Sequence, residues 1–235
     1  MVSYKKKFPG LQVRNNDIAF TFKAPSKIAV VGSYMSQTMF KPELNIDLTV
    51  QIPSSCLKQT DVKDYRYYDI RALYLAVVGE ELTRHKEFSN AQWQLWREDP
   101  LKPILILHPQ LNNQKVSKTV VKIIPSIKSG EFKLNKLLPN KCNLTDDKES
   151  EEEGSTGTAE GTTSPTPRYN NGVIEDMYYA THLELIHNTI SSSVSLTDAI
   201  MLLKVSAVIY LLDGHLSVFR CGCVRDRTTT TTVKL

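Results

Sequence analysis

Hydrophobic and polar residues alternate along residues 45–52, with the period of a half-buried β-strand. A β-branched run at residues 28–31 predicts a second strand just before it. Gly32 and Ser33 lie between the two, where a glycine permits a sharp turn and close approach to a ligand. We therefore predict a strand, a tight turn, a short helix and a second strand that carries Asp47.

A long helix is predicted from Asp64 onward, because apolar side chains recur there at steps of three and four, at Tyr67, Ile70, Tyr74 and Val77. Asp61 or Asp64 is placed to cap its first turn. Arg66 and Arg71 lie off the apolar stripe, so we predict that both face outward.

Further elements follow from shorter patterns. Ile18, Phe20 and Phe22 alternate as in a short strand, and residues 104–109 and 120–127 are strand-like runs. Helical spacing of apolar residues predicts one helix over residues 174–186 and the start of another over residues 196–205.

The acidic and then Gly/Ser/Thr-rich residues 145–166 hold too few apolar side chains to offset their ordering entropy, so we predict a disordered linker at a domain boundary. The formal net charge is +4. Without residues 146–153, which contain six acids and one lysine, 28 basic residues face 19 acidic ones. Such an excess suits a polyanionic partner such as RNA.

The cysteines indicate neither a zinc site nor a disulfide framework, since Cys56, Cys142, Cys221 and Cys223 form no pair of Cys-x-x-Cys motifs. A reducing intracellular compartment is therefore expected. Neither a signal peptide nor an apolar run of bilayer length is evident, so no membrane is expected as a partner.

The stretch around Gly32, Ser33 and Asp47 resembles the signature of polymerase-β-like nucleotidyltransferases. In that family an Asp-x-Asp pair on the second strand holds two Mg²⁺ ions. Here Asn45 takes the place of the first acid, and Lys122 stands on a later strand where no third acid is evident. A hard dication needs several anionic ligands, so we expect remnants of the signature without catalytic residues, bound metal or cofactor. The alternative is an ordinary Gly-Ser turn.

Several motifs, in order, carry a second resemblance. The run IPSSCLKQTDVKDYRYYDIRALYLA begins at Ile52, and FKLNKLLPNKCN begins at Phe132. A Pro-Thr-Pro-x-Tyr-Asn motif at 165–170, the Glu175-Asp176 pair and AIMLLKV at 199–205 follow. Together they resemble the nucleolar RNA-associated protein family, Nrap, and this resemblance stops at Ser206.

The resemblance implies an α/β fold, with a nucleotidyltransferase-like mixed sheet and helices over residues 1–144. Residues 145–167 would be the linker and 168–205 the start of a helical, poly(A)-polymerase-like second domain. Residues 206–235 would be a divergent tail without an assigned function.

The family also implies a non-catalytic scaffold in the nucleolus that binds precursor ribosomal RNA, or other RNA, and assembly proteins of the small-subunit processome. No small-molecule substrate is expected. We take Lys63, Arg66, Arg71 and Lys122 as candidates for contacting RNA or a partner, because Lys and Arg contacts to phosphates give salt-dependent affinity with little sequence preference.

Two alternatives remain from the sequence. One is an active metal-dependent nucleotidyltransferase. The other is a truncated module without independent function, in which the apolar side chains of an incomplete second domain lack part of their core, at Leu185, Ile186, Leu202 and Leu203.

Overall fold

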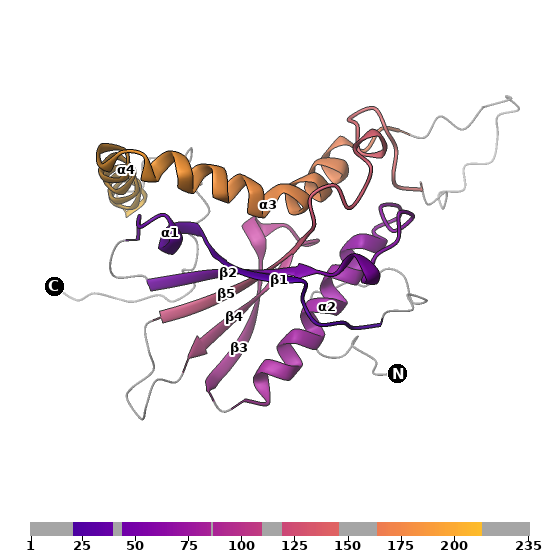
Figure 1. Cartoon of the computed structure of the whole chain (residues 1–235), viewed down its shortest axis with the longest axis horizontal. Coiled ribbons are helices and arrows are strands. Elements are labelled where there is room, and N and C mark those ends of the chain that lie inside the picture. Colours follow the sequence, from indigo (N-terminus) through magenta and orange to yellow (C-terminus); the bar gives the residue numbers. More distant parts are fainter. Residues whose placement is uncertain (1–20, 40–43, 86, 110–118, 146–163, 213–235) are drawn as a thin grey trace, which may run out of the picture.

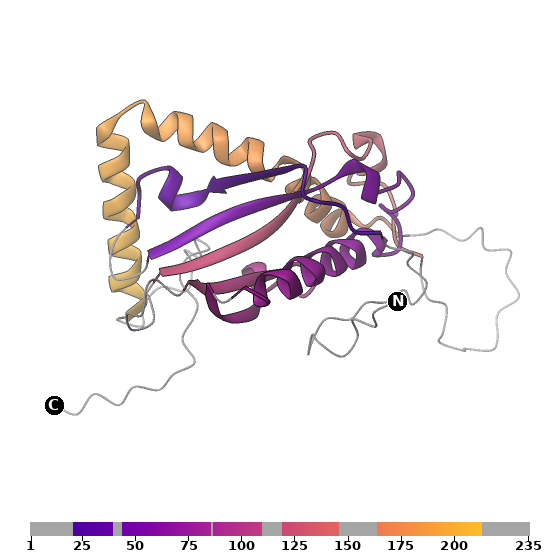
Figure 2. The same cartoon turned by 60° about the horizontal axis from the view of Figure 1, so that its bottom comes forward.

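A computed structural model describes residues 21–39, 44–85, 87–109, 119–145 and 164–212. It contains one five-stranded sheet with helices on both faces (Figures 1 and 2). The strands are β1 (Lys27–Val31), β2 (Leu44–Ile52), β3 (Phe88–Leu95), β4 (Pro103–Pro109) and β5 (Thr119–Ile127). The α-helices are α1 (Gly32–Met35), α2 (Arg66–Thr83), α3 (Pro167–Ser191) and α4 (Val194–Leu212). Short 3₁₀ turns occupy Ser54–Cys56, Trp96–Glu98 and Leu134–Lys136.

The sheet is mixed, with strand order β1-β2-β5-β4-β3. The β2–β5 pair is parallel, and the other three pairs are antiparallel. The α/β architecture and the strands predicted at residues 28–31, 45–52, 104–109 and 120–127 are confirmed. The sequence did not predict β3, whose Asn90 and Ala91 are poor strand formers. Of the strand expected over residues 18–22, only Thr21 and Phe22 lie in the described chain, and neither is in a strand.

The alternation along β2 places its apolar and its polar side chains on opposite faces of the sheet. Leu48 and Val50 line an apolar groove together with Val78 and Leu82 of α2. The intervening polar side chains point to the opposite face, over which α3 passes (Figure 2). The polar residues of β2 therefore lie beneath α3 and α4 rather than in bulk solvent.

Helix α2 packs through the predicted stripe, of which Tyr67, Ile70 and Tyr74 are buried. The predicted cap is wrong, because no side chain among the described residues caps α2, which follows Tyr65 in a left-handed conformation. Asp61 is used differently. Its carboxylate accepts the Lys58 N–H at 2.7 Å, and its carbonyl accepts the Tyr67 N–H at 2.8 Å.

The two predicted C-terminal helices are confirmed as α3 and α4, and α4 continues past Ser206. The first half of α3 shares the core of the sheet, where Tyr169, Val173 and Met177 pack in one apolar cluster with Phe132. The division into domains at residue 168 remains a prediction. Residues 146–163 and 213–235, which include Cys221 and Cys223, lie outside the described residues.

The outer parts of α3 and α4 expose the apolar side chains that the sequence singled out. Leu185, Leu202 and Leu203 are 65%, 68% and 69% exposed, and Ile186 is 38% exposed. In the described ranges no single helix is long and apolar enough to cross a bilayer. Helix α3 and residues 194–208 have sufficient length and apolar character only when taken together, and a bend of 113° separates them.

Candidate functional site

The residues of the Gly-Ser signature meet at the junction of β1, α1 and β2. Val31 pairs with Asp47 across the antiparallel strands, so the turn at Gly32 lies directly against the Asp47 carboxylate. Gly32 has a φ of +74°, and a Cβ placed on it would lie 2.5 Å from Asp47 Oδ2. Glycine is therefore needed here both for its backbone conformation and for its lack of a side chain.

Two ammonium groups from different elements act on Asp47. Lys122 is its register partner on β5, and Lys204 projects from α4. Burial raises the pKa of the Asp47 carboxyl, and the charges of Lys122 and then Lys204 partly offset this effect. Within the described residues, Asp47 Oδ1 is buried and has no hydrogen-bond partner. Burial of the carboxyl group therefore outweighs the attraction of the two lysines, and no hydrogen bond from the described part of the chain to Oδ1 offsets it.

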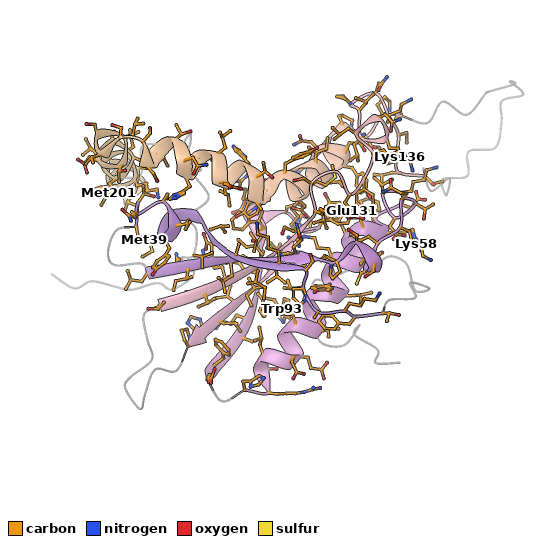
Figure 3. All side chains as sticks on the ribbon, in the orientation of Figure 1. Met39, Lys58, Trp93, Glu131, Lys136 and Met201 are labelled. Atoms are coloured by element: carbon orange, nitrogen blue, oxygen red, sulfur yellow. The ribbon has the colours of Figure 1, made fainter. Side chains whose placement is uncertain are left out.

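Lys204 also joins α4 to the end of the α1 turn. Its Nζ donates to the Thr38 carbonyl at 3.1 Å and contacts Thr38 Oγ1 at 2.9 Å. Ser36 supports the turn from within, since its hydroxyl donates to the Gly32 carbonyl at 3.0 Å and lies 2.9 Å from Thr38 Oγ1. The fold thereby places a helix from the C-terminal part of the described chain beside the Gly-Ser turn (Figure 3, near Met39 and Met201).

Tyr179 of α3 completes the surroundings of Asp47. Burial raises the pKa of Tyr179, and the Asp47 charge is the next cause. Its ring stacks edge-on against Trp96, with centroids 6.0 Å apart. Helices α3 and α4 therefore both contribute side chains near Asp47.

The donor set around Asp47 does not fit a two-metal centre. No group of three or more His, Cys, Asp or Glu side chains suited to a metal occurs in the described chain. Asn45, two residues before Asp47 on β2, supplies a neutral amide and no charge. The nearest charged neighbours are lysines, whose ammonium groups repel a dication. The arrangement suits an internally compensated carboxylate better than metal-assisted chemistry.

Ser33 is half-buried in the first turn of α1. Its carbonyl accepts the Thr38 N–H at 2.9 Å, which closes the turn. Because α1 has only four residues, this turn offers little of the aligned backbone dipole that a longer helix would present to an anion.

Of the sequence candidates, Gly32, Ser33, Asn45, Asp47 and Lys122 belong to this one region. The sequence did not select Lys204, although it is the lysine of the AIMLLKV motif and follows a run of apolar residues. Lys204 is the one lysine of the apolar helix α4. Its isolated charge could have indicated that the side chain has a specific partner.

Lys63 and Arg66 lie elsewhere, in and just after the loop between β2 and α2, at the opposite end of the sheet (Figure 1). Lys63 is exposed. Arg66 is half-exposed, and its Nε lies 3.4 Å from Oδ1 of the buried Asp61. Part of its charge is therefore compensated within the protein.

The prediction that Arg71 faces outward is wrong. Its side chain is 0% exposed, and its Nε lies 3.0 Å from Asp176 Oδ2 of α3. Arg71 Nη1 also donates to the Pro103 carbonyl at 2.7 Å. Helix α2 is covered by the sheet on one side and by the start of α3 on another, so a residue off the apolar stripe is still enclosed. Arg71 is consequently not available to contact RNA in this structure.

Two further side chains contact the Asp176 carboxylate. Tyr67 Oη donates to Asp176 Oδ2 at 2.8 Å, and the Nζ of the buried Lys102 lies 3.1 Å from Oδ1. Lys102 Nζ also lies 2.7 Å from Glu175 Oε2. The Glu175-Asp176 pair thus fastens α3 to α2 and to the start of β4.

Comparison with known proteins identifies the family. Residues 2–192 match the family model described as Nrap protein domain 1. The chain belongs to the Nrap family. It is 40% identical over 187 residues to Nucleolar protein 6 of Xenopus laevis, which covers 79% of this chain and 16% of that relative.

Two mammalian relatives match a segment of the same length. Nucleolar protein 6 of Mus musculus and of Homo sapiens are each 32% identical over 187 residues, again covering 16% of the relative. The chain thus spans about one sixth of the length of the curated relatives it matches.

The Nrap motifs of this chain are largely structural. Arg71 and Asp176 form the buried ion pair. Asn143, from the FKLNKLLPNKCN motif, donates through Nδ2 to Asn170 Oδ1 at 2.7 Å, and Asn170 belongs to the Pro-Thr-Pro-x-Tyr-Asn motif. Motifs far apart in the sequence therefore meet in pairs inside the fold.

Proposed function

We propose that this chain is a non-catalytic binding module in ribosome biogenesis. It acts in the nucleolus as part of a scaffold of the small-subunit processome and contacts precursor ribosomal RNA and assembly proteins. Nucleolar localisation rests on the curated relatives, each named Nucleolar protein 6. Family membership supports the RNA-related role, and the activity of the much longer relatives is part of the proposal.

The environment of Asp47 is the observation that carries the non-catalytic part. A nucleotidyltransferase-like site needs clustered carboxylates to hold its metal ions. Here a single buried carboxylate faces Lys122 and Lys204, and Asn45 stands where a second acid is needed. Such a fold retains its shape for binding after its metal ligands are replaced.

Crosslinking tests the scaffold role. The tagged full chain is crosslinked in nuclear extract, and the RNA and proteins purified with it are identified together. We expect precursor ribosomal RNA and processome proteins to be enriched over a tag-only control. Recovery of neither with soluble protein would overturn the proposal for this chain.

An enzyme assay tests the catalytic alternative. The chain is incubated with an RNA primer, nucleoside triphosphates and Mg²⁺ or Mn²⁺, beside the Asp47→Ala variant. We expect no primer extension by either protein. Metal-dependent extension that Asp47→Ala abolishes would show that the site is active.

A further inference from the structure

We propose that RNA phosphates bind to a basic corner of the fold, a surface distinct from the Asp47 region. This deepens the proposed function and rests on it. The basic corner consists of six side chains from three segments: Lys58 and Lys63 of the β2–α2 loop, Lys133, Lys136 and Lys141 of the loop after β5, and Arg168 of α3. Figure 3 shows Lys58 and Lys136 at this end of the molecule, far from Met201 of α4.

Hydrogen bonds fasten the β2–α2 loop to the loop after β5. Lys136 Nζ donates to the Gln59 carbonyl at 3.0 Å, and the Gln59 side-chain amide donates to the Glu131 carbonyl. The Asp64 N–H donates to the Asn143 carbonyl at 2.8 Å. Lys58 and Lys63, which flank these contacts, are therefore held beside the lysines of the second loop.

The loop after β5 is fastened in turn to the start of α3. The Thr166 N–H donates to the Lys141 carbonyl at 3.1 Å, and Asn170 Nδ2 donates to the same carbonyl at 2.9 Å. The buried Asn143 bridges the two, since its Nδ2 contacts both the Lys136 carbonyl and Asn170 Oδ1. Arg168 thus lies close to Lys141 on a preordered backbone, which lowers the entropy lost on binding.

The charge of the basic corner is largely uncompensated by its own acids. Residues 54–66, 128–145 and 164–168 hold eight basic and three acidic residues. Asp61 is buried and pairs with Arg66, and Asp64 Oδ1 accepts the Thr145 N–H at 2.7 Å. Glu131 accepts a hydrogen bond from Ser54. The three acids therefore leave five of the eight positive charges of these segments uncompensated. Five basic side chains of the corner are exposed, namely Lys58, Lys63, Lys133, Lys141 and Arg168.

The composition of the corner favours phosphates over base edges. Five of the six side chains are lysines, which act as flexible point charges suited to phosphate oxygens. Contacts of this kind give affinity that falls with salt and depends little on sequence. An acidic protein segment is the competing ligand, and the test distinguishes it from RNA.

Titration of the full chain with a fluorescein-labelled single-stranded RNA, over a salt series, tests the proposal. The test variant combines Lys133→Gln, Lys141→Gln and Arg168→Gln, which break no side-chain hydrogen bond of the described structure. The slope of log affinity against log salt is negative, and each lost phosphate contact should make it shallower by about 0.7, so the triple variant should have a slope shallower by about 2. Arg168→Gln has a matched control in Arg84→Gln, an exposed arginine at the far end of α2, which should leave the slope unchanged.

The outcomes are separable. Wild-type binding that the triple variant retains would place the RNA site elsewhere and leave the scaffold proposal intact. Binding of a labelled poly-glutamate peptide at the corner, without RNA binding, would overturn RNA as the ligand. If the chain binds neither RNA nor the peptide, the proposed site is wrong. The crosslinking experiment would still test the scaffold role separately.

A second measurement keeps the test independent of folding. Acetylation of lysines in the wild-type chain, with and without RNA, is read by mass spectrometry. RNA should protect Lys58, Lys133 and Lys141 and leave Lys204 unchanged. Acetylation of Lys58, Lys133 and Lys141 that bound RNA leaves unchanged would contradict the proposal.

Discussion

Arg71 Nε of α2 lies 3.0 Å from Asp176 Oδ2 of α3, and both side chains are enclosed. The contact joins a helix that follows β2 to a helix on the other side of residues 146–163. Tyr67 and Lys102 contact the same carboxylate. The pair therefore fixes how α3 approaches the rest of the fold, and with it the position of α4 beside Asp47.

Arg71→Ala should strongly destabilise the protein. Without Arg71 the buried Asp176 carboxylate keeps Lys102 as a charged partner, so we expect a loss at or somewhat below the roughly 3–5 kcal/mol that breaking a buried pair typically costs. Urea unfolding followed by circular dichroism measures the change. Arg84→Ala is the matched control, because Arg84 forms exposed ion pairs on the same helix and should change stability by less than about 1 kcal/mol. Similar small losses for both variants would show that the pair does not fasten α3.

Gly32→Ala should destabilise more than Gly130→Ala. Both glycines have a positive φ, +74° and +77°, but a Cβ on Gly130 would meet nothing within 4 Å, whereas one on Gly32 meets the Asp47 carboxylate. The backbone strain common to both is about 1–2 kcal/mol, so the difference in unfolding free energy reports the contact with Asp47.

A further variant checks this interpretation. In an Asp47→Ala background, Gly32→Ala should cost about as much as Gly130→Ala does in the wild type. If the excess cost of Gly32→Ala persists without the carboxylate, the clash is not its cause.

Asp47→Asn should stabilise the protein at neutral pH. Burial raises the pKa of Asp47 in the folded state, so the folded protein binds a proton more readily than the unfolded chain does. Its ionisation therefore costs stability as the pH rises from the ordinary Asp pKa, about 3.9, through the raised value.

The advantage of Asp47→Asn should accordingly vanish below the ordinary Asp pKa and reach a constant level above the raised one. Unfolding free energies of the two proteins across pH 3 to 8 measure the difference. An advantage that shrinks as the pH rises would mean that attraction from Lys122 and Lys204 outweighs desolvation.

The bond between Lys204 and Thr38 should couple α4 to the α1 turn. A double-mutant cycle with Lys204→Met and Thr38→Val isolates the bond to Thr38 Oγ1, with an expected coupling of about 1 kcal/mol. Thr189→Val is the control partner, because Thr189 donates to the Leu185 carbonyl within α3. Additive effects in the first cycle would show that the contact contributes nothing to stability.

Local patterns were sufficient to predict most elements. The alternation in β2, the β-branched run of β1 and the spacing in α2 are properties of neighbouring residues, and each element was found. Gly32 meets Asp47 because β1, the turn and β2 follow one another closely, with Val31 paired to Asp47. The Nrap motifs predicted the family correctly, because several of them occur along this chain in the same order as in the family.

The sequence by itself determined most of the elements, the α/β class and the family, because short-range periodicity and ordered motifs encode them. Only the tertiary structure decided which charges are free. Arg71 is buried because α3 returns over α2, Lys204 reaches Thr38 from α4, and the Lys141 carbonyl accepts a hydrogen bond from Asn170 of α3. These contacts connect residues far apart in the chain, and burial of a charge depends on what packs over it rather than on its neighbours in sequence.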